Sequence, residues 1–154
     1  MATKKVCFVA SSGGHLEEIS RLKEIESKYD SFLVTEKSDF EVKNFCKRKY
    51  YIYQMNRREI FFLPKFIGLF IIAWRMLHKE HPDFVITTGA LAAYPFCIIA
   101  KYMGMKVVYI ESFARVHYPS LTGKLLYNFA DLFIVQWEDM LESYPKSVLG
   151  GGIF

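Results

Sequence analysis

The stretch that decides the fold is Val6-Cys7-Phe8-Val9-Ala10-Ser11-Ser12-Gly13-Gly14-His15-Leu16-Glu17-Glu18. Its first part is an apolar run of strand-forming residues, which serine and glycine then interrupt. Helical spacing resumes at Leu16, Ile19, Leu22 and Ile25. We therefore expect a buried strand, a tight glycine turn, and a helix whose first N–H groups point at the turn. A helix start of this kind favours an anion, typically a phosphate.

The rest of the chain alternates short apolar runs with helical patterns, which predicts a parallel α/β sheet. Further strands are expected at Ser31–Thr35, Tyr50–Tyr53, Asp83–Thr88, Lys106–Ile110 and Leu132–Val135. Further helices are expected around Glu41–Lys47, from Leu91 to Met103, and from Lys124 to Ala130. Because no linker or internal repeat interrupts this alternation, residues 1–154 are expected to form one Rossmann-like domain with helices on both faces of the sheet.

The composition limits the class of protein. The chain of 154 residues is 52% hydrophobic and 17% aromatic, which implies surface given to a partner or a membrane as well as a core. A net charge of +4 suits an anionic ligand or lipid headgroups, and we expect no nucleic-acid partner. Cys7, Cys46 and Cys97 are widely spaced and predict buried, reduced thiols in a cytosolic protein without a secretion signal.

Polar and glycine residues gather where the expected strands end, which is the edge where ligands bind in such a sheet. The loops concerned are Ser11–His15, Glu36–Ser38, Asn56–Glu59, Thr87–Ala90, Glu111–Arg115 and Gln136–Glu138. Two of them, Gly13-Gly14-His15 and Thr87-Thr88-Gly89, repeat the same device of a glycine between a strand and a helix. Each alone is explained by ordinary helix capping. Together, on one edge, they favour an anion pocket.

Three side chains in these loops can carry chemistry. His15 stands in the first turn of its expected helix, where the dipole favours a neutral imidazole that can accept a proton; the alternative is a plain capping residue. Glu111 and Arg115 either pair with each other, or Glu111 accepts hydrogen bonds from sugar hydroxyls or a main-chain amide while Arg115 binds a phosphate or carboxylate. The 4 histidines lack metal-ligand spacing, so we expect neither a metal nor a cofactor.

An alternative interpretation is a self-sufficient nucleotide-binding enzyme. The turn lacks the third glycine of the dinucleotide fingerprint and the Gly-Lys-Ser/Thr of a P-loop. Glu36 stands at the end of the second expected strand, where a ribose-binding acid would lie, but this single residue is a weak signal. A nucleotide is therefore the less favoured anion.

The apolar segment Ile60–Leu77 differs from the rest of the chain. Its longest uncharged run, Phe66 to Trp74, is shorter than the roughly 20 residues needed to span a bilayer. Basic residues flank the segment at Arg57, Arg58, Lys65, Arg75, His78 and Lys79. Two interpretations stay open: a core helix, or a helix with one face in the core and one end at the membrane surface. The residues expected at the membrane are Phe66, Ile67, Phe70, Ile71, Trp74 and Arg75.

Blocks along nearly the whole chain resemble the asparagine-linked-glycosylation fourteen family, and more narrowly its bacterial capsule and exopolysaccharide members. They are Ser11-Ser12-Gly13-Gly14-His15-Leu16-Glu17, Thr87-Thr88-Gly89, Tyr109-Ile110-Glu111-Ser112-Phe113-Ala114-Arg115-Val116, Ser120-Leu121-Thr122-Gly123-Lys124, Asp131, Gln136-Trp137-Glu138, Tyr144-Pro145 and Gly150-Gly151. The Glu-Ser-Phe-Ala-Arg and Gln-Trp-Glu blocks are the most specific.

The resemblance implies the amino-terminal half of a split GT-B glycosyltransferase, inactive without a catalytic subunit that binds a nucleotide sugar such as a UDP-sugar. It implies a peripheral position at the inner face of the plasma membrane, where the pair would extend a lipid-diphosphate-linked saccharide. Because the amino-terminal anchor of eukaryotic members is not seen here, membrane contact would fall on residues 60–77 or on the partner. The resemblance implies that Gly13, Gly14 and His15 face the acceptor diphosphate or the reacting hydroxyl, with Glu111 nearby. Together with the loop residues named above, the expected acceptor-site residues are Ser12, Gly13, Gly14, His15, Thr88, Gly89 and Arg115, and the catalytic candidates are His15 and Glu111.

Overall fold

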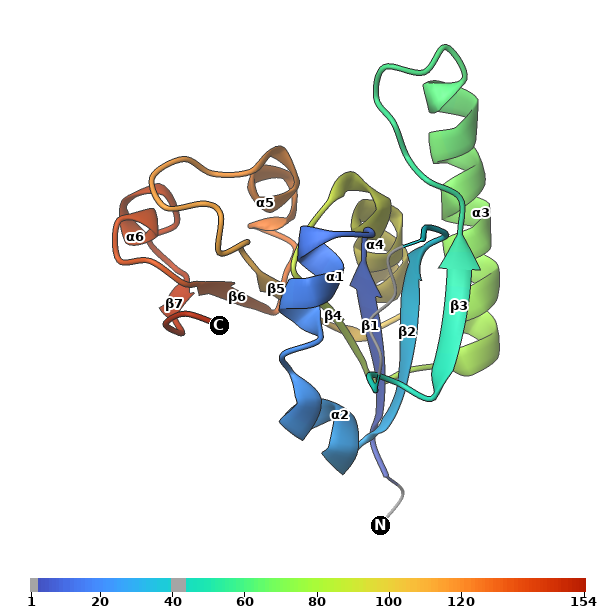
Figure 1. Cartoon of the computed structure of the whole chain (residues 1–154), viewed down its shortest axis with the longest axis horizontal. Helices are drawn as coiled ribbons and strands as arrows, with labels where there is room; N and C mark the ends of the chain where they lie inside the picture. Colours follow the sequence, from blue (N-terminus) through green and yellow to red (C-terminus); the bar gives the residue numbers. More distant parts are fainter. Residues whose placement is uncertain (1–2, 40–43) are drawn as a thin grey trace.

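The computed structural model describes residues 3–39 and 44–154 and contains one seven-stranded sheet in the order β3-β2-β1-β4-β5-β6-β7 (Figure 1). Every pairing between neighbouring strands is parallel. The strands are β1 (Lys5–Ala10), β2 (Asp30–Glu36), β3 (Arg48–Ile52), β4 (Phe84–Thr87), β5 (Lys106–Ile110), β6 (Leu132–Val135) and β7 (Val148–Leu149). The strand order reverses between β1 and β4, so the loops that follow these two strands flank the usual ligand crevice of a doubly wound sheet.

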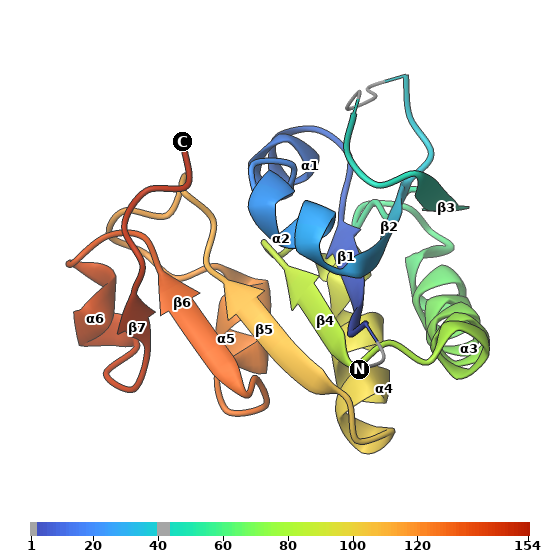
Figure 2. The same ribbon diagram turned by 90° about the horizontal axis from the view of Figure 1, so that it is seen from below.

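Helices cover both faces of the sheet, which confirms the expected fold class. The helices are α1 (Gly14–Ile19), α2 (Lys23–Lys28), α3 (Phe62–Glu80), α4 (Tyr94–Tyr102), α5 (Leu121–Leu126) and α6 (Met140–Ser143), with a 3-10 turn η1 (Leu91–Ala93) before α4. Figure 2 shows α1 and α2 on one face and α3, α4 and α5 on the other. Strand β1 serves both cores, because Phe8 packs with the α1 side while Cys7 and Val9 pack with the α3 and α4 side.

Helix α3 is amphipathic, and its amino-terminal end rises beyond the carboxyl edge of the sheet (Figure 1). Leu69, Ala73 and Leu77 are buried at a spacing of four residues and attach the helix to the core. The helix ends at His81, which adopts a left-handed conformation and donates its N–H to the Leu77 carbonyl at 2.8 Å. No helix within the described part of the chain has the length and apolar character needed to cross a bilayer.

Several local expectations differ from the structure. The helix expected from Lys124 to Ala130 is α5 at Leu121–Leu126, because the Ser120 hydroxyl caps its first turn. The helix expected over Leu16–Ile25 breaks into α1 and α2, because the Ser20 hydroxyl donates to the Glu17 carbonyl at 2.6 Å and ends the first helix. Of the helix expected around Glu41–Lys47, residues 41–43 lie outside the described part and residues 44–47 form a turn and bends. Strand β7 was not expected, since it has two residues and is followed by glycines.

Candidate anion-binding site

The two glycine loops predicted from the sequence are tied to each other at the carboxyl edge of the sheet. The imidazole Nδ1 of His15 donates to the Thr88 carbonyl at 3.0 Å, and the Thr88 hydroxyl donates to the His15 carbonyl at 3.0 Å. A carbonyl can only accept, so Nδ1 carries the proton and Nε2 is the nitrogen left for a ligand. The reciprocal pair therefore fixes both the orientation and the tautomer of His15.

Gly89 allows this close approach. Its φ is +109°, and a Cβ here would lie 3.0 Å from the Tyr109 hydroxyl and 3.4 Å from Cε1 of His15. The next residue, Ala90, also has a positive φ of 70°, an uncommon conformation for a residue with a Cβ. The backbone after β4 is thus shaped to bring the imidazole and Ala90 to the same cavity.

A cavity of about 290 Å³ opens between these loops and two further segments. It is lined, among others, by His15, Arg57, Ala90, Arg115, Ser120 and Thr122. Arg57 and Arg115 are exposed, and neither guanidinium has a carboxylate partner among residues 3–39 and 44–154. Two unpaired guanidiniums, an imidazole and hydroxyl groups form a donor set suited to an oxyanion such as a diphosphate. The volume is at the low end of the roughly 300–1,000 Å³ of small-molecule pockets, so the rest of a large ligand would lie outside the cavity.

Glu111 points into the protein and not into the cavity. Only 1% of the residue is exposed, and its carboxylate accepts hydrogen bonds from the hydroxyls of Tyr109 (3.3 Å) and Tyr144 (2.9 Å). It also accepts the backbone N–H groups of Ser112 and Ser120, both at 3.2 Å. Burial and the adjacent carboxylate raise the pKa of both tyrosines, which therefore remain protonated donors.

The structure thus selects between the two alternatives for Glu111 and Arg115. They do not pair with each other, and Glu111 accepts main-chain amides as one of the alternatives proposed. Because its oxygens are taken by four protein donors and it does not line the cavity, the geometry favours a supporting role. A catalytic role for Glu111 remains a prediction.

The other residues predicted for the site lie in the first glycine loop. Ser12 donates both its N–H (3.3 Å) and its hydroxyl (3.4 Å) to Glu36, which also accepts the N–H of Met55 at 2.9 Å. Glu36 is therefore occupied, not free to hold a ribose. Gly13, with φ +82°, and Gly14 leave open space where a Cβ would stand. The helix that follows is only six residues long, so its dipole is weaker than the sequence suggested.

Sequence reasoning missed part of the cavity. It grouped Arg57 with the cations flanking the apolar segment, although the residue also lies in the loop after the third strand. It named Ser120 and Thr122 only within a block that resembles the family. In the structure both line the cavity, and the Ser120 hydroxyl accepts the Gly123 N–H at 2.9 Å and caps α5. The loop Asn56–Glu59 was expected at this edge of the sheet, but Arg57 was not singled out within it as a site residue.

The apolar segment presents an exposed row of side chains that is separate from its buried row. We call this row the α3 stripe: Ile60, Phe61, Leu63, Ile67, Ile71 and Trp74. Phe66 and Phe70, expected at the membrane, instead lie half-buried, with ring centroids 6.3 Å from that of Tyr94 on α4. The helix turns these two rings toward α4, and their expected place at the membrane stays a prediction. Arg75 is exposed beside the stripe.

Comparison with known proteins identifies relatives along the full length of the chain. The family model for oligosaccharide biosynthesis protein Alg14 like matches residues 6–153. The proteins named UDP-N-acetylglucosamine transferase subunit ALG14 from Rattus norvegicus and Homo sapiens are each 31% identical. The matches cover 95% and 96% of this chain and 81% and 82% of the relatives.

Solved structures show the same fold. Acinetobacter baumannii MurG superposes with a TM-score of 0.72 at 19% identity, over 88% of this chain and 42% of that one. UDP-N-acetylglucosamine 2-epimerase from Rickettsia bellii gives 0.75 at 16% identity, over 98% of this chain and 45% of that one. The chain therefore spans less than half of these GT-B-type proteins, and the likeness at such identities concerns the fold. Since the family model covers nearly every residue and the sequence relatives match along their length, the chain belongs to the Alg14-like family of oligosaccharide biosynthesis proteins.

Proposed function

We propose that this protein is the acceptor-side subunit of a two-subunit glycosyltransferase, and that its cavity binds the diphosphate of a lipid-diphosphate-linked saccharide. The observation that carries the proposal is a pair of guanidiniums, Arg57 and Arg115, that lie beside His15 in one cavity and have no carboxylate partner in the described part of the chain. Membership of the Alg14-like family supports the subunit role, because the relatives are named as subunits of a UDP-N-acetylglucosamine transferase. The donor would accordingly be UDP-N-acetylglucosamine, bound by the catalytic partner.

The geometry suggests a role for each side chain. Arg57 and Arg115 would neutralise the diphosphate with charge-assisted hydrogen bonds. Nε2 of His15 is free to accept the proton of the reacting saccharide hydroxyl, while the Thr88 carbonyl holds Nδ1 protonated. As that hydroxyl oxygen bonds to the anomeric carbon of the donor sugar, the bond from this carbon to UDP breaks and UDP leaves. This chain would therefore position and deprotonate the acceptor, and the partner would hold the donor.

The α3 stripe supports a peripheral position at the cytoplasmic face of a membrane. Ile60, Phe61 and Leu63 are exposed at the helix end that rises beyond the sheet edge, close in sequence to Arg57 of the cavity. Apolar side chains can enter the interface while nearby cations meet anionic headgroups. A lipid-linked acceptor held at Arg57 would then have its lipid directed toward the stripe.

The cellular pathway is a separate question from the reaction. The capsule and exopolysaccharide setting that the sequence resemblance suggests remains a prediction, since the relatives reported above are eukaryotic and their names do not refer to capsule. The chemistry proposed for the cavity is the same in either setting, because it concerns the diphosphate and the acceptor hydroxyl.

The proposal is tested by kinetics of this chain co-expressed with its catalytic partner subunit. Arg57→Ala and Arg115→Ala are each expected to raise the KM for a lipid-diphosphate acceptor about tenfold or more, because each removes a charge-assisted contact. The KM for UDP-N-acetylglucosamine should stay within about twofold. Lys28→Ala serves as the charge-matched control. It removes an exposed positive charge at the end of α2, just before β2 begins and away from the carboxyl edge of the sheet. An unchanged acceptor KM in both arginine variants would contradict the proposal.

A further inference from the structure

Three segments that are far apart in the sequence meet in one buried cluster beside the cavity. They contribute Glu18 of α1, Gln136 after β6, and the loop of residues 111–120 that carries Arg115. We infer that Glu18 and Gln136 form a buried bridge that positions the 111–120 loop, and that Glu18 is a positioning residue for acceptor binding. The kinetic part of this inference rests on the proposed function, whereas the structural part does not.

Glu18 is buried without a cationic partner. Only 2% of it is exposed, and no ion pair to it is found among the described residues. Its carboxylate instead accepts the Phe113 N–H at 2.5 Å, the Gln136 Nε2 at 2.5 Å and the Ser112 hydroxyl at 3.1 Å. A buried carboxylate is tolerated only when such donors replace water, so the loop and Glu18 stabilise each other.

Gln136 connects the same loop to β6. Its side chain is 5% exposed, and Nε2 donates a second hydrogen bond to the Glu111 carbonyl at 3.0 Å. Its Oε1 accepts the Ile153 N–H at 2.8 Å, which fixes the direction of the amide. The neighbouring Trp137 donates Nε1 to the Phe113 carbonyl at 2.8 Å.

These contacts matter because the 111–120 segment has no helix or strand of its own. Its backbone groups must find side-chain partners, and Glu18, Gln136 and Trp137 supply them at the start of the loop. Glu111 binds the N–H of Ser120 and thereby holds the end of the loop. With both ends fixed, Arg115 is held at the cavity, and release of the first end would displace its guanidinium.

Two substitutions of Glu18 separate geometry from charge. Glu18→Ala removes all three acceptor contacts and is expected to raise the acceptor KM about tenfold or more in the co-expressed pair, since small misplacements of binding groups have effects of this size or larger. The KM for UDP-N-acetylglucosamine should change by less than about twofold. Glu18→Gln should recover most of the loss, because its amide oxygen can accept both N–H donors while its NH₂ donates to the Ser112 hydroxyl.

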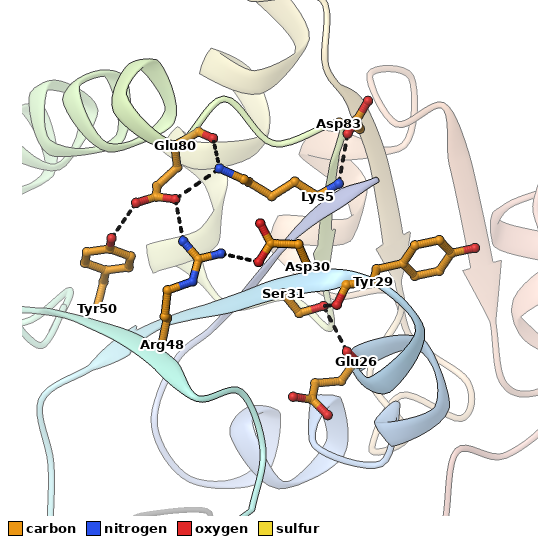
Figure 3. A network of polar contacts seen from close by, with 9 residues as sticks. All are labelled: Lys5, Glu26, Tyr29, Asp30, Ser31, Arg48, Tyr50, Glu80 and Asp83. Atoms are coloured by element: carbon orange, nitrogen blue, oxygen red, sulfur yellow. Dashed lines mark hydrogen bonds and ion pairs between the residues drawn. The ribbon is translucent and has the colours of Figure 1, made fainter. Parts of the chain in front are cut away.

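Glu80 offers a matched control (Figure 3). It is also a buried carboxylate, 8% exposed, and accepts hydrogen bonds from Arg48 (2.9 Å), Lys5 (3.4 Å) and the Tyr50 hydroxyl (2.5 Å). Lys5 and Arg48 are the first residues of β1 and β3, at the amino ends of the strands and opposite the cavity. Glu80→Ala is therefore expected to lower the thermal midpoint by at least as much as Glu18→Ala while leaving the acceptor KM unchanged.

Trp137 supplies a signal that does not depend on transferase activity. The chain has 2 tryptophans, so in a Trp74→Phe background the emission reports Trp137 and its contact with Phe113. Well below the thermal midpoint, Glu18→Ala should shift this emission to longer wavelength. Glu18→Gln and Glu80→Ala should not.

The outcomes separate the two claims. If Glu18→Ala leaves both the Trp137 emission and the acceptor KM unchanged, or if Glu80→Ala raises the acceptor KM equally, the positioning role is overturned. If Arg115→Ala leaves the acceptor KM unchanged while Glu18→Ala still shifts the emission, the acceptor assignment fails and the bridge is supported. A raised acceptor KM in both Arg115→Ala and Glu18→Ala, with recovery in Glu18→Gln, supports both.

Discussion

Gly123 lies next to the candidate site, where α5 packs against the buried carboxylate of Glu111. A Cβ at this position would lie 2.2 Å from Oε2 of Glu111, 2.6 Å from the Tyr144 hydroxyl and 3.0 Å from the Ser120 hydroxyl. The ordered groups around it, themselves hydrogen-bonded to one another, cannot retreat without losing those bonds. The absence of a side chain here is therefore a requirement of the Glu111 cluster.

Gly123→Ala is expected to destabilise the protein by about 2–3 kcal/mol, through overpacking and loss of hydrogen bonds to a buried carboxylate. Urea denaturation followed by circular dichroism measures this change. Gly14→Ala is the matched control, because it lies in a helix with open space around the new methyl group and should be neutral or stabilising by up to about 1 kcal/mol. Equal stability of the two variants would show that Glu111 is not packed as described.

Asp131, directly before β6, makes the stability of the fold depend on pH. Partial burial opposes ionisation, but the Val107 N–H (2.9 Å) and the ammonium groups of Lys101 (3.0 Å) and Lys106 (3.1 Å) outweigh it and lower the pKa of Asp131 to about 2. Its ordinary value is 3.8, so the ionised group stabilises the folded state above about pH 4, and this contribution is lost as the pH falls toward 2.

Asp131→Asn should accordingly reduce stability at pH 7 by about 1 kcal/mol, a figure that allows for solvent screening of the lysines. The difference from the unsubstituted protein should shrink between pH 4 and pH 2. Denaturant midpoints measured at pH 7, 4 and 2.5 test this. A constant difference over that range would rule out the assigned cause.

For single residues, the sequence predicted those that directly follow a strand end, and it missed those whose role depends on partners far away in the chain. His15 and Arg115 follow strand ends and line the cavity, as expected. The environment of Glu111 could not be predicted, because it depends on Tyr144, a residue 33 positions away that a single sequence does not connect to it. Glu18 was hidden for the same reason, since its donors come from residues more than 90 positions along the chain.

Helix α3 has two apolar rows with different surroundings. One row, with Leu69, Ala73 and Leu77, is fully buried, whereas Ile67 and Ile71 of the α3 stripe are each 57% exposed. An apolar row that the fold leaves open, next to basic residues, is typical of a surface for membranes or partners. The helix thus has the core face that both interpretations of its sequence required, and contact of its exposed row with a membrane stays a prediction.

The double variant Ile67→Asp/Ile71→Asp should weaken binding to vesicles of anionic phospholipid by more than about tenfold, since each change removes an apolar side chain from the interface and adds a negative charge. Vesicle co-sedimentation measures the change, and the thermal midpoint should barely move. Phe70→Asp, in contrast, should lower the thermal midpoint, because the Phe70 ring packs against Tyr94. Unchanged vesicle binding in the double variant would remove the membrane role from the stripe.

Strands and helices with a regular spacing of apolar residues could be predicted from the sequence, whereas very short elements and breaks within helices could not. The strands expected at Lys106–Ile110 and Leu132–Val135 match β5 and β6 residue for residue. The break between α1 and α2 depends on the Ser20 hydroxyl, which donates to the Glu17 carbonyl, and the spacing of apolar residues does not predict such a bond. Strand β7 exists because Val148 and Leu149 pair with Ile134 and Val135, a contact set by the whole sheet.

At the scale of the molecule, the fold presents one polar edge with one candidate anion cavity formed by loops of β1, β4 and β5 together with Arg57. The chain spans 42% of the MurG structure and 45% of the epimerase structure that share its fold. A cavity of about 290 Å³ fits the charged part of one ligand better than two complete substrates. We therefore propose that the acceptor is held on this chain and the donor on a partner.

Isothermal titration of the chain alone tests that claim most directly, with a water-soluble short-chain polyprenyl-diphosphate saccharide in one cell and UDP-N-acetylglucosamine in another. We predict saturable binding of the diphosphate acceptor, weakened about tenfold or more by Arg57→Ala/Arg115→Ala, and no saturable binding of UDP-N-acetylglucosamine. Saturable binding of UDP-N-acetylglucosamine that the double variant abolishes, with no binding of the acceptor, would contradict the account.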